Sequence, residues 1–145
     1  MALGQIFGTA AVSGILFILL SHPITYNLTN KLFSTWNESI KCPTNYGHLF
    51  HVIIFFILSL LFKVIFNMTE RRYDRKGFGV LLKFALYCSL LFFVISGKET
   101  YEITGSLSRG VLANGGCATG WGVATHGIIL FLITFLAMLL PNDCD

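Results

Sequence analysis

CPTNYGHLFHVIIFF, residues 42–56, and CATGWGVATHGIILF, residues 117–131, follow one pattern: Cys-x-Thr-x-aromatic-Gly-x-x-x-His-x-Ile-Ile-x-Phe. In each copy a polar stretch with an aromatic residue leads directly into an apolar run. This arrangement is typical of a loop that enters a membrane-spanning helix through the interface. The sequence therefore predicts two equivalent loop-to-helix junctions in one chain.

The similarity extends beyond these two stretches when the sequence is shifted by 75 positions without gaps. Matches of Cys, Tyr, Gly and His carry more weight than apolar matches, which any two membrane helices share. We expect a tandem duplication of a helix–loop–helix unit, with repeats at 1–67 and 78–145 and a connector at 68–77. Because each unit crosses the membrane twice, the two copies are parallel and related by a pseudo-twofold axis along the membrane normal. The matched pairs include Thr25/Thr100, Tyr26/Tyr101, Cys42/Cys117, Gly47/Gly122 and His51/His126.

The amino-acid composition is typical of a membrane protein. Of the 145 residues, 54% are hydrophobic and 12% charged, whereas soluble domains carry about 25% charged residues. A spanning helix needs about 20 mainly apolar residues, and the first of the apolar segments is the shortest. It lacks the basic start of a signal peptide, so we expect a retained helix. The predicted fold is an all-α membrane protein with four transmembrane helices, at 6–20, 47–66, 78–96 and 122–140.

The distribution of basic residues predicts the orientation. The loops at 21–46 and 97–121 carry few basic residues over a greater length than the connector. The positive-inside rule places the connector in the cytosol. Both termini are then expected on the cytosolic side, and the two longer loops on the other. The connector's basic residues are Arg71, Arg72, Arg75 and Lys76.

The predicted orientation also indicates on which side of the membrane several other residues lie. Lys63 and Lys83 are expected to extend toward the cytosolic surface. The glycosylation triplets at Asn27 and Asn37 fall in a non-cytosolic loop. An interfacial aromatic belt is expected on the same side, formed by Tyr26, Tyr46, Tyr101 and Trp121.

The first helix also carries two pairs of small residues, Gly4-x-x-x-Gly8 and Ala10-x-x-x-Gly14. Such faces allow close packing between membrane helices. Chance abundance of small residues explains them equally well.

The four cysteines are divided by the predicted topology. Cys88 lies within a span and Cys144 in the cytosolic tail, whereas Cys42 and Cys117 share the non-cytosolic side. Disulfides form in that compartment when it derives from the endoplasmic reticulum. We predict a Cys42–Cys117 disulfide; two free thiols with a shared packing role are the alternative.

His51 and His126 are the main candidates for chemistry, about one turn inside their helices. We favour a scaffolding role, in which each imidazole bonds a loop carbonyl or the hydroxyl of Thr44 or Thr119. Two inward imidazoles are also able to ligate a haem iron or form a proton path. With scaffolding favoured, we expect no cofactor, no metal site and no enzymatic activity.

The pattern Cys-x-Thr-x-x-Gly-x-x-x-His before an apolar helix, with PNDCD at 141–145, resembles small multi-span membrane proteins of large icosahedral DNA viruses, such as chloroviruses. The resemblance implies a structural virion protein that links an inner membrane, derived from the host endoplasmic reticulum, to minor capsid proteins. Its partners are then the bilayer and other capsid or membrane proteins, with no nucleic acid or small-molecule substrate.

Under this hypothesis the basic connector contacts anionic headgroups or acidic faces of capsid proteins. A plain topology signal is the alternative for the connector. For the whole protein, a small transporter or channel is the competing class, followed by a haem-binding membrane protein.

Overall fold

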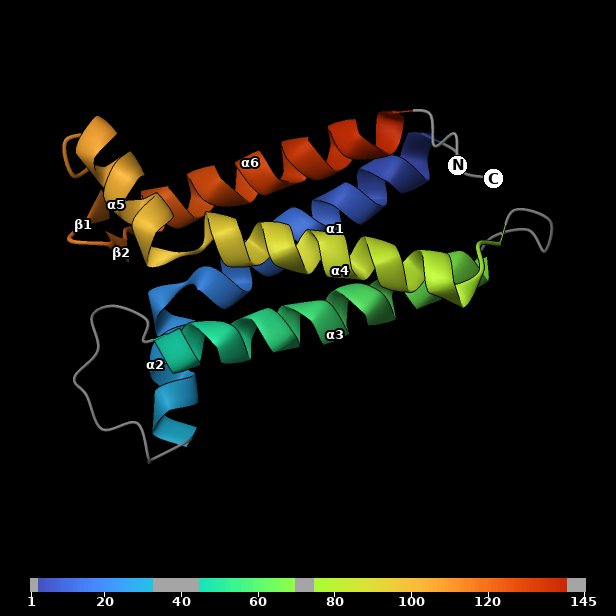
Figure 1. Ribbon diagram of the computed structural model, residues 1–145, viewed down its shortest axis with the longest axis horizontal. Coiled ribbons are helices and arrows are strands. Elements are labelled where there is room, and N and C mark those ends of the chain that lie inside the picture. Colours follow the sequence, from blue (N-terminus) through green and yellow to red (C-terminus); the bar gives the residue numbers. More distant parts are fainter. Residues whose placement is uncertain (1–2, 33–44, 70–74, 141–145) are drawn as a thin grey trace.

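The computed structural model describes residues 3–32, 45–69 and 75–140 (Figure 1). Within these ranges, four helices are long and apolar enough to cross a membrane, as the sequence predicts. They mark the chain as a multi-pass membrane protein. Their bounds are α1 Leu3–Ser21, α3 Asn45–Thr69, α4 Phe78–Ile95 and α6 Gly120–Leu139.

The shorter elements gather at one end of these four helices, which we call the outer end (Figure 1). The opposite end, where α3 finishes and α4 begins, is called the inner end. The short helices cross the direction of the long ones, and the two strands form a small antiparallel hairpin that pairs Ala113 with Ala118. The bounds are α2 Pro23–Leu32, α5 Lys98–Leu107, β1 Ala113–Asn114 and β2 Cys117–Ala118.

The chain turns sharply from each span into its short helix. Pro23 opens α2 because its fixed φ suits the first helical position and its missing N–H is not needed there. The Nδ1 atom of His22 accepts a hydrogen bond from the amide of Ile24 at 3.3 Å. Gly97 occupies the equivalent place before α5, with extended backbone.

Packing in the bundle is interleaved between the two halves of the chain. The most extensive helix contacts are α1 with α6 and α3 with α4, followed by α1 with α3. The buried centre is aromatic: the Phe92 ring lies 5.3 Å from that of Phe17 and 4.5 Å from that of Phe55. Large apolar side chains cover the outside of the long helices, as lipid contact requires, including Ile15, Leu61, Leu90 and Leu136.

The close approach of α1 and α6 depends on glycine. A Cβ on Gly14 would lie 3.0 Å from the carbonyl oxygen of Gly127, and a Cβ on Gly127 would lie 2.5 Å from Cγ1 of Ile18. Gly4 and Gly8 have no neighbour within 4 Å at the Cβ position. Of the two small-residue pairs in α1, the one ending at Gly14 therefore lies in a helix contact.

The two short helices begin 75 residues apart, α2 at Pro23 and α5 at Lys98. The turns are also held alike. The hydroxyl of Thr25 donates to the carbonyl of Leu19 at 2.5 Å, and that of Thr100 donates to the carbonyl of Val94 at 2.6 Å.

Candidate functional site

Four buried side chains form a tyrosine–histidine cluster at the outer end: Tyr26 on α2, His51 on α3, Tyr101 on α5 and His126 on α6. Tyr26 and Tyr101 are only 6% and 2% exposed, so neither lies in the interfacial aromatic belt that we expected. The Tyr26 ring stacks on His51 at 4.0 Å, and the Tyr101 ring meets His126 edge-on at 4.7 Å. The other two aromatics of that expected belt, Tyr46 and Trp121, are each 76% exposed.

His51 connects three helices through both ring nitrogens. Its Nδ1 lies 2.7 Å from the carbonyl oxygen of Leu20 and therefore donates to it. In a neutral ring the other nitrogen, Nε2, is an acceptor and lies 3.1 Å from the Thr29 hydroxyl, which also lies within donating distance of the carbonyls of Thr25 and Tyr26. His51 thus ties α3 to the end of α1 and to α2.

His126 is bonded differently. Its Nδ1 donates to the carbonyl of Gly122 in its own helix at 2.7 Å. Its Nε2 makes no hydrogen bond with any residue that the structure describes. The Nε2 atoms of the two histidines therefore have different surroundings, with the Thr29 hydroxyl beside that of His51 only. Among the described residues, no group of three or more His, Cys, Asp or Glu side chains is placed to hold a metal ion.

Thr119, not His126, fastens the hairpin to α6. Its hydroxyl lies 2.7 Å from the carbonyl oxygen of Val111 and 2.9 Å from that of Leu112. The same hydroxyl accepts from the amide of Gly122 at 3.1 Å, which caps the start of α6. Thr44, the equivalent residue of the first half, lies outside the described residues.

The two buried tyrosines are held in their neutral form. Burial raises the pKa of Tyr26 and of Tyr101 well above the ordinary value for tyrosine, because a phenolate loses hydration there. The hydroxyl of Ser21 lies near that of Tyr101, without the geometry of a full hydrogen bond, and partly offsets the rise of its pKa. The cluster therefore joins spans and short helices by packing as well as by hydrogen bonds.

Lys63 departs from its expected position. It does not extend to the surface but is 6% exposed, with its ammonium nitrogen 5.9 Å from the ring centre of Phe84. Lys83, in contrast, is exposed. The Lys63 side chain turns inward because it lies on the same face of α3 as the buried Ser59, one turn away. Helical spacing places Lys63 on the same face as Ser59, but which face of α3 is buried depends on packing.

The basic connector is described only in part. Arg71 and Arg72 lie outside the described residues. Arg75 donates through Nη2 to the carbonyl of Met68 at 3.1 Å. The side-chain amide of Asn67 bonds the backbone of Lys76 twice, accepting at 2.8 Å and donating at 3.0 Å. These contacts hold the start of α4 against the end of α3 at the inner end.

The structure describes two of the four cysteines. Cys117 takes part in a disulfide, and Cys88 is a buried free thiol. Cys42 and Cys144 lie outside the described residues, so pairing between Cys42 and Cys117 stays a prediction. Of the two glycosylation triplets, Asn27 is exposed on α2, whereas Asn37 also lies outside the described residues.

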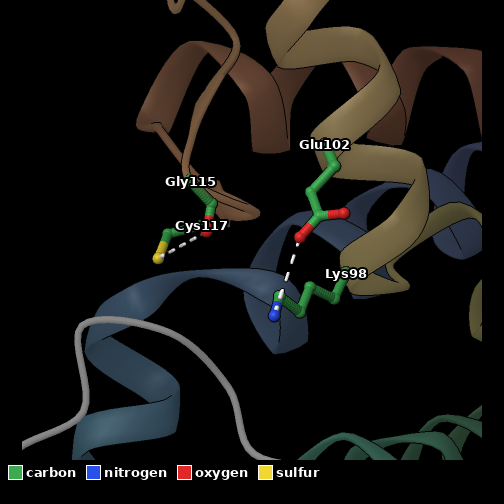
Figure 2. A network of polar contacts seen from close by, with 4 residues as sticks. All are labelled: Lys98, Glu102, Gly115 and Cys117. Atoms are coloured by element: carbon green, nitrogen blue, oxygen red, sulfur yellow. Dashed lines mark hydrogen bonds and ion pairs between the residues drawn. The ribbon is translucent and has the colours of Figure 1, made fainter.

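The surface around Cys117 is polar (Figure 2). Lys98 and Glu102 form an ion pair of 3.6 Å on α5, beside the hairpin residues Gly115 and Cys117. A Cβ on Gly116 would lie 2.8 Å from Cγ of Lys98, so glycine lets the hairpin approach this pair. An open groove of ≈ 560 Å³ runs between α5 and the hairpin, lined in part by Glu102, Ser106, Arg109 and Asn114.

Comparison of the chain with protein-family models, with curated proteins and with solved structures finds no match.

Proposed function

We propose that the protein is a structural membrane protein: the bundle is anchored in lipid, and the outer end is a rigid platform for neighbouring proteins. The observation that carries the proposal is how the outer end is built. Buried side chains hold α2 and α5 against the spans, namely Tyr26, Tyr101 and His51. Thr119 fixes the hairpin in the same way. The groove of ≈ 560 Å³ between α5 and the hairpin gives the platform an open recess with mixed polar and apolar lining, in the volume range of ligand sites.

The setting that we propose is the inner membrane of a large icosahedral DNA virus, where the protein links the bilayer to minor capsid proteins. Support comes from the Cys-x-Thr-x-x-Gly-x-x-x-His junctions and the PNDCD end. The basic connector supports a cytosolic inner end, with the outer end on the other side of a membrane derived from the endoplasmic reticulum.

The two halves are proposed to descend from a tandem duplication. The starts of α2 and α5, which lie 75 residues apart, support this, as do the matched hydrogen bonds of Thr25 and Thr100. Each half also places a tyrosine of its short helix against a histidine of its second span.

Photo-crosslinking in assembled particles tests the structural role. The crosslinking amino acid replaces Ser106 on the outer platform, Lys76 at the inner end, or Leu61, a control that is 51% exposed on the side of a span. We expect protein adducts from Ser106 and Lys76 and only lipid adducts from Leu61. Lipid adducts alone from all three positions would contradict the proposal.

A second experiment addresses the basic connector. Reversing the charges of Arg71, Arg72, Arg75 and Lys76 is expected to impair incorporation into particles, because anionic headgroups or acidic capsid faces then repel the inner end. Protease protection must show that the variant keeps its orientation. Normal incorporation of a correctly oriented variant would leave the connector as a topology signal only.

One observation favours a second candidate function, a small proton or ion transporter. Lys63 is an ionisable residue buried within a span, and such residues often mark transport paths. Proteoliposomes carrying the wild type or Lys63→Met distinguish the two functions: transport requires a flux that the substitution abolishes, whereas a structural protein gives no flux in either sample.

A further inference from the structure

Lys63 lines a small cavity between α1 and α3, with a volume of ≈ 10 Å³. The lining combines polar and apolar side chains: Thr9, Val12 and Ser13 on α1, and Ser59, Phe62, Lys63 and Phe66 on α3. The Lys63 side chain is more than nine-tenths buried, and its nitrogen makes no hydrogen bond or ion pair with any part of the chain that the structure describes. An amine in this position lacks the partner that a buried polar group needs.

The two serines that line this cavity each donate their hydroxyl proton to a backbone carbonyl. Ser13 donates its hydroxyl proton to the carbonyl of Thr9 at 3.0 Å, and Ser59 donates to the carbonyl of Phe56 at 3.0 Å. Because a hydroxyl has a single proton, both oxygens have only lone pairs left to offer. Lys63 offers N–H donors. The polar part of the lining therefore combines N–H donors from Lys63 with acceptor lone pairs from the two serines.

We propose that Lys63, Ser13 and Ser59 form a binding site for one buried water molecule. The water oxygen accepts from the Lys63 nitrogen, and the two water protons are donated to the serine oxygens. This arrangement gives each of the three side chains a hydrogen bond to the water. The volume of ≈ 10 Å³ is about that needed for a single water.

Other small occupants fit the cavity less well. A halide ion would be attracted by the lysine but would face the lone pairs of two serine oxygens. A metal cation would suit those oxygens but would face the lysine nitrogen. Of these three occupants, only water both accepts and donates hydrogen bonds, so it suits the lysine nitrogen as well as the serine oxygens.

The bound water has a structural consequence that does not depend on the proposed function. It connects Ser13 of α1 with Ser59 and Lys63 of α3 in the inner half of the bundle, where the tyrosine–histidine cluster does not reach. It also explains how a lysine is accommodated inside an apolar span without an acidic partner among the described residues.

Nuclear magnetic resonance on the full-length protein in lipid nanodiscs, with isotope-labelled lysine, tests the site. Lys63→Met identifies the Lys63 signals. We expect a magnetisation-transfer peak between a long-lived water and the Lys63 side chain, and its loss in the double variant Ser13→Ala/Ser59→Ala. Ser89→Ala is the matched control, because Ser89 is equally buried and donates to the carbonyl of Ala85 at 2.7 Å but does not line this cavity.

Three outcomes would overturn the proposal: no water peak at Lys63 in the folded wild type, a peak that persists in the double variant, or a Lys63 signal that changes when chloride is removed. If the double variant does not fold, the single variants Ser13→Ala and Ser59→Ala are compared. Each is expected to weaken the peak, and a peak unchanged in both would also overturn the site.

Discussion

Two histidines that are 75 residues apart make different contacts, and this is the clearest asymmetry at the residue scale. His51 bonds one carbonyl and one hydroxyl on two other helices, whereas His126, among the described residues, bonds only a carbonyl of its own turn. A satisfied imidazole that links helices stabilises the fold, and one that bonds its own helix adds little.

Replacement of each histidine by phenylalanine tests this difference. His51→Phe is expected to lower the free energy of unfolding by about 2 kcal/mol, because it removes the contacts with Leu20 and Thr29 and takes the side-chain donor from the Leu20 carbonyl. His126→Phe is expected to cost less than about 1 kcal/mol, since the helix backbone already satisfies the Gly122 carbonyl. Unfolding of both variants in the same detergent measures the difference; equal losses would contradict it.

The buried tyrosines predict a loss of stability in alkali. Burial raises the pKa of Tyr26 and Tyr101 in the folded state, while the unfolded chain has the ordinary value of about 10. Above about pH 10 the unfolded state gives up protons that the folded state keeps, so stability falls as pH rises, by up to about 1.4 kcal/mol per pH unit for each tyrosine.

Denaturant unfolding at a series of alkaline pH values measures this slope. The double variant Tyr26→Phe/Tyr101→Phe is expected to have a shallower slope than the wild type. Tyr46→Phe is the control, because that side chain is 76% exposed. If the double variant loses stability with pH as steeply as the wild type, groups other than these two tyrosines cause the loss.

At the scale of elements, the hairpin rests on α6 through one glycine. A Cβ on Gly122 would overlap the carbonyl oxygen of Leu112, which also accepts the Thr119 amide at 3.0 Å. Gly120 starts the same helix with nothing within 4 Å of its Cβ position. The two glycines therefore form a matched pair.

Gly122→Ala is expected to lower the free energy of unfolding by about 2–3 kcal/mol through overpacking. Gly120→Ala is expected to change it by less than about 1 kcal/mol. Hydrogen exchange gives the local readout: the Thr119 amide becomes less protected in Gly122→Ala only. Equal protection in both variants would show that the hairpin moves without cost.

The spans could be predicted from sequence because apolar length is a local property. The end of α1 at Ser21 follows from the proline at 23, which is equally local. Burial of Lys63, Tyr26 and Tyr101 could not be predicted in this way, because it depends on how each helix is rotated against its neighbours. Helix rotation is set by packing, and sequence spacing gives only the faces that are available.

The candidate site was predicted in part for the same reason. The shift by 75 positions identified His51 and His126, but their partners lie on other helices and have no fixed spacing from them. Leu20 and Thr29, which bond His51, are 31 and 22 residues away in the chain. Such long-range contacts are determined by which helices lie next to each other in the bundle and by how they are rotated.

At the scale of the whole molecule, the interleaved packing makes each half depend on the other. The two most extensive helix contacts, α1 with α6 and α3 with α4, both join one half of the chain to the other. The Phe17–Phe92 and Phe55–Phe92 contacts at the centre also cross between halves. A half on its own would leave its main packing faces against lipid or another copy.

The two halves are therefore expected to assemble from separate chains. Residues 1–72 and 73–145, co-expressed and purified through a tag on one of them, should co-purify in mild detergent under reducing conditions, because helix packing holds the interface without covalent links. Gly127→Leu in the second fragment is expected to weaken co-purification, since Gly127 is where α6 approaches Ile18. Ile128→Leu is the control, because Ile128 is 57% exposed. Monomeric, stably folded halves that ignore each other would contradict interleaved packing, whereas self-association of either half alone would show that the two interfaces are interchangeable.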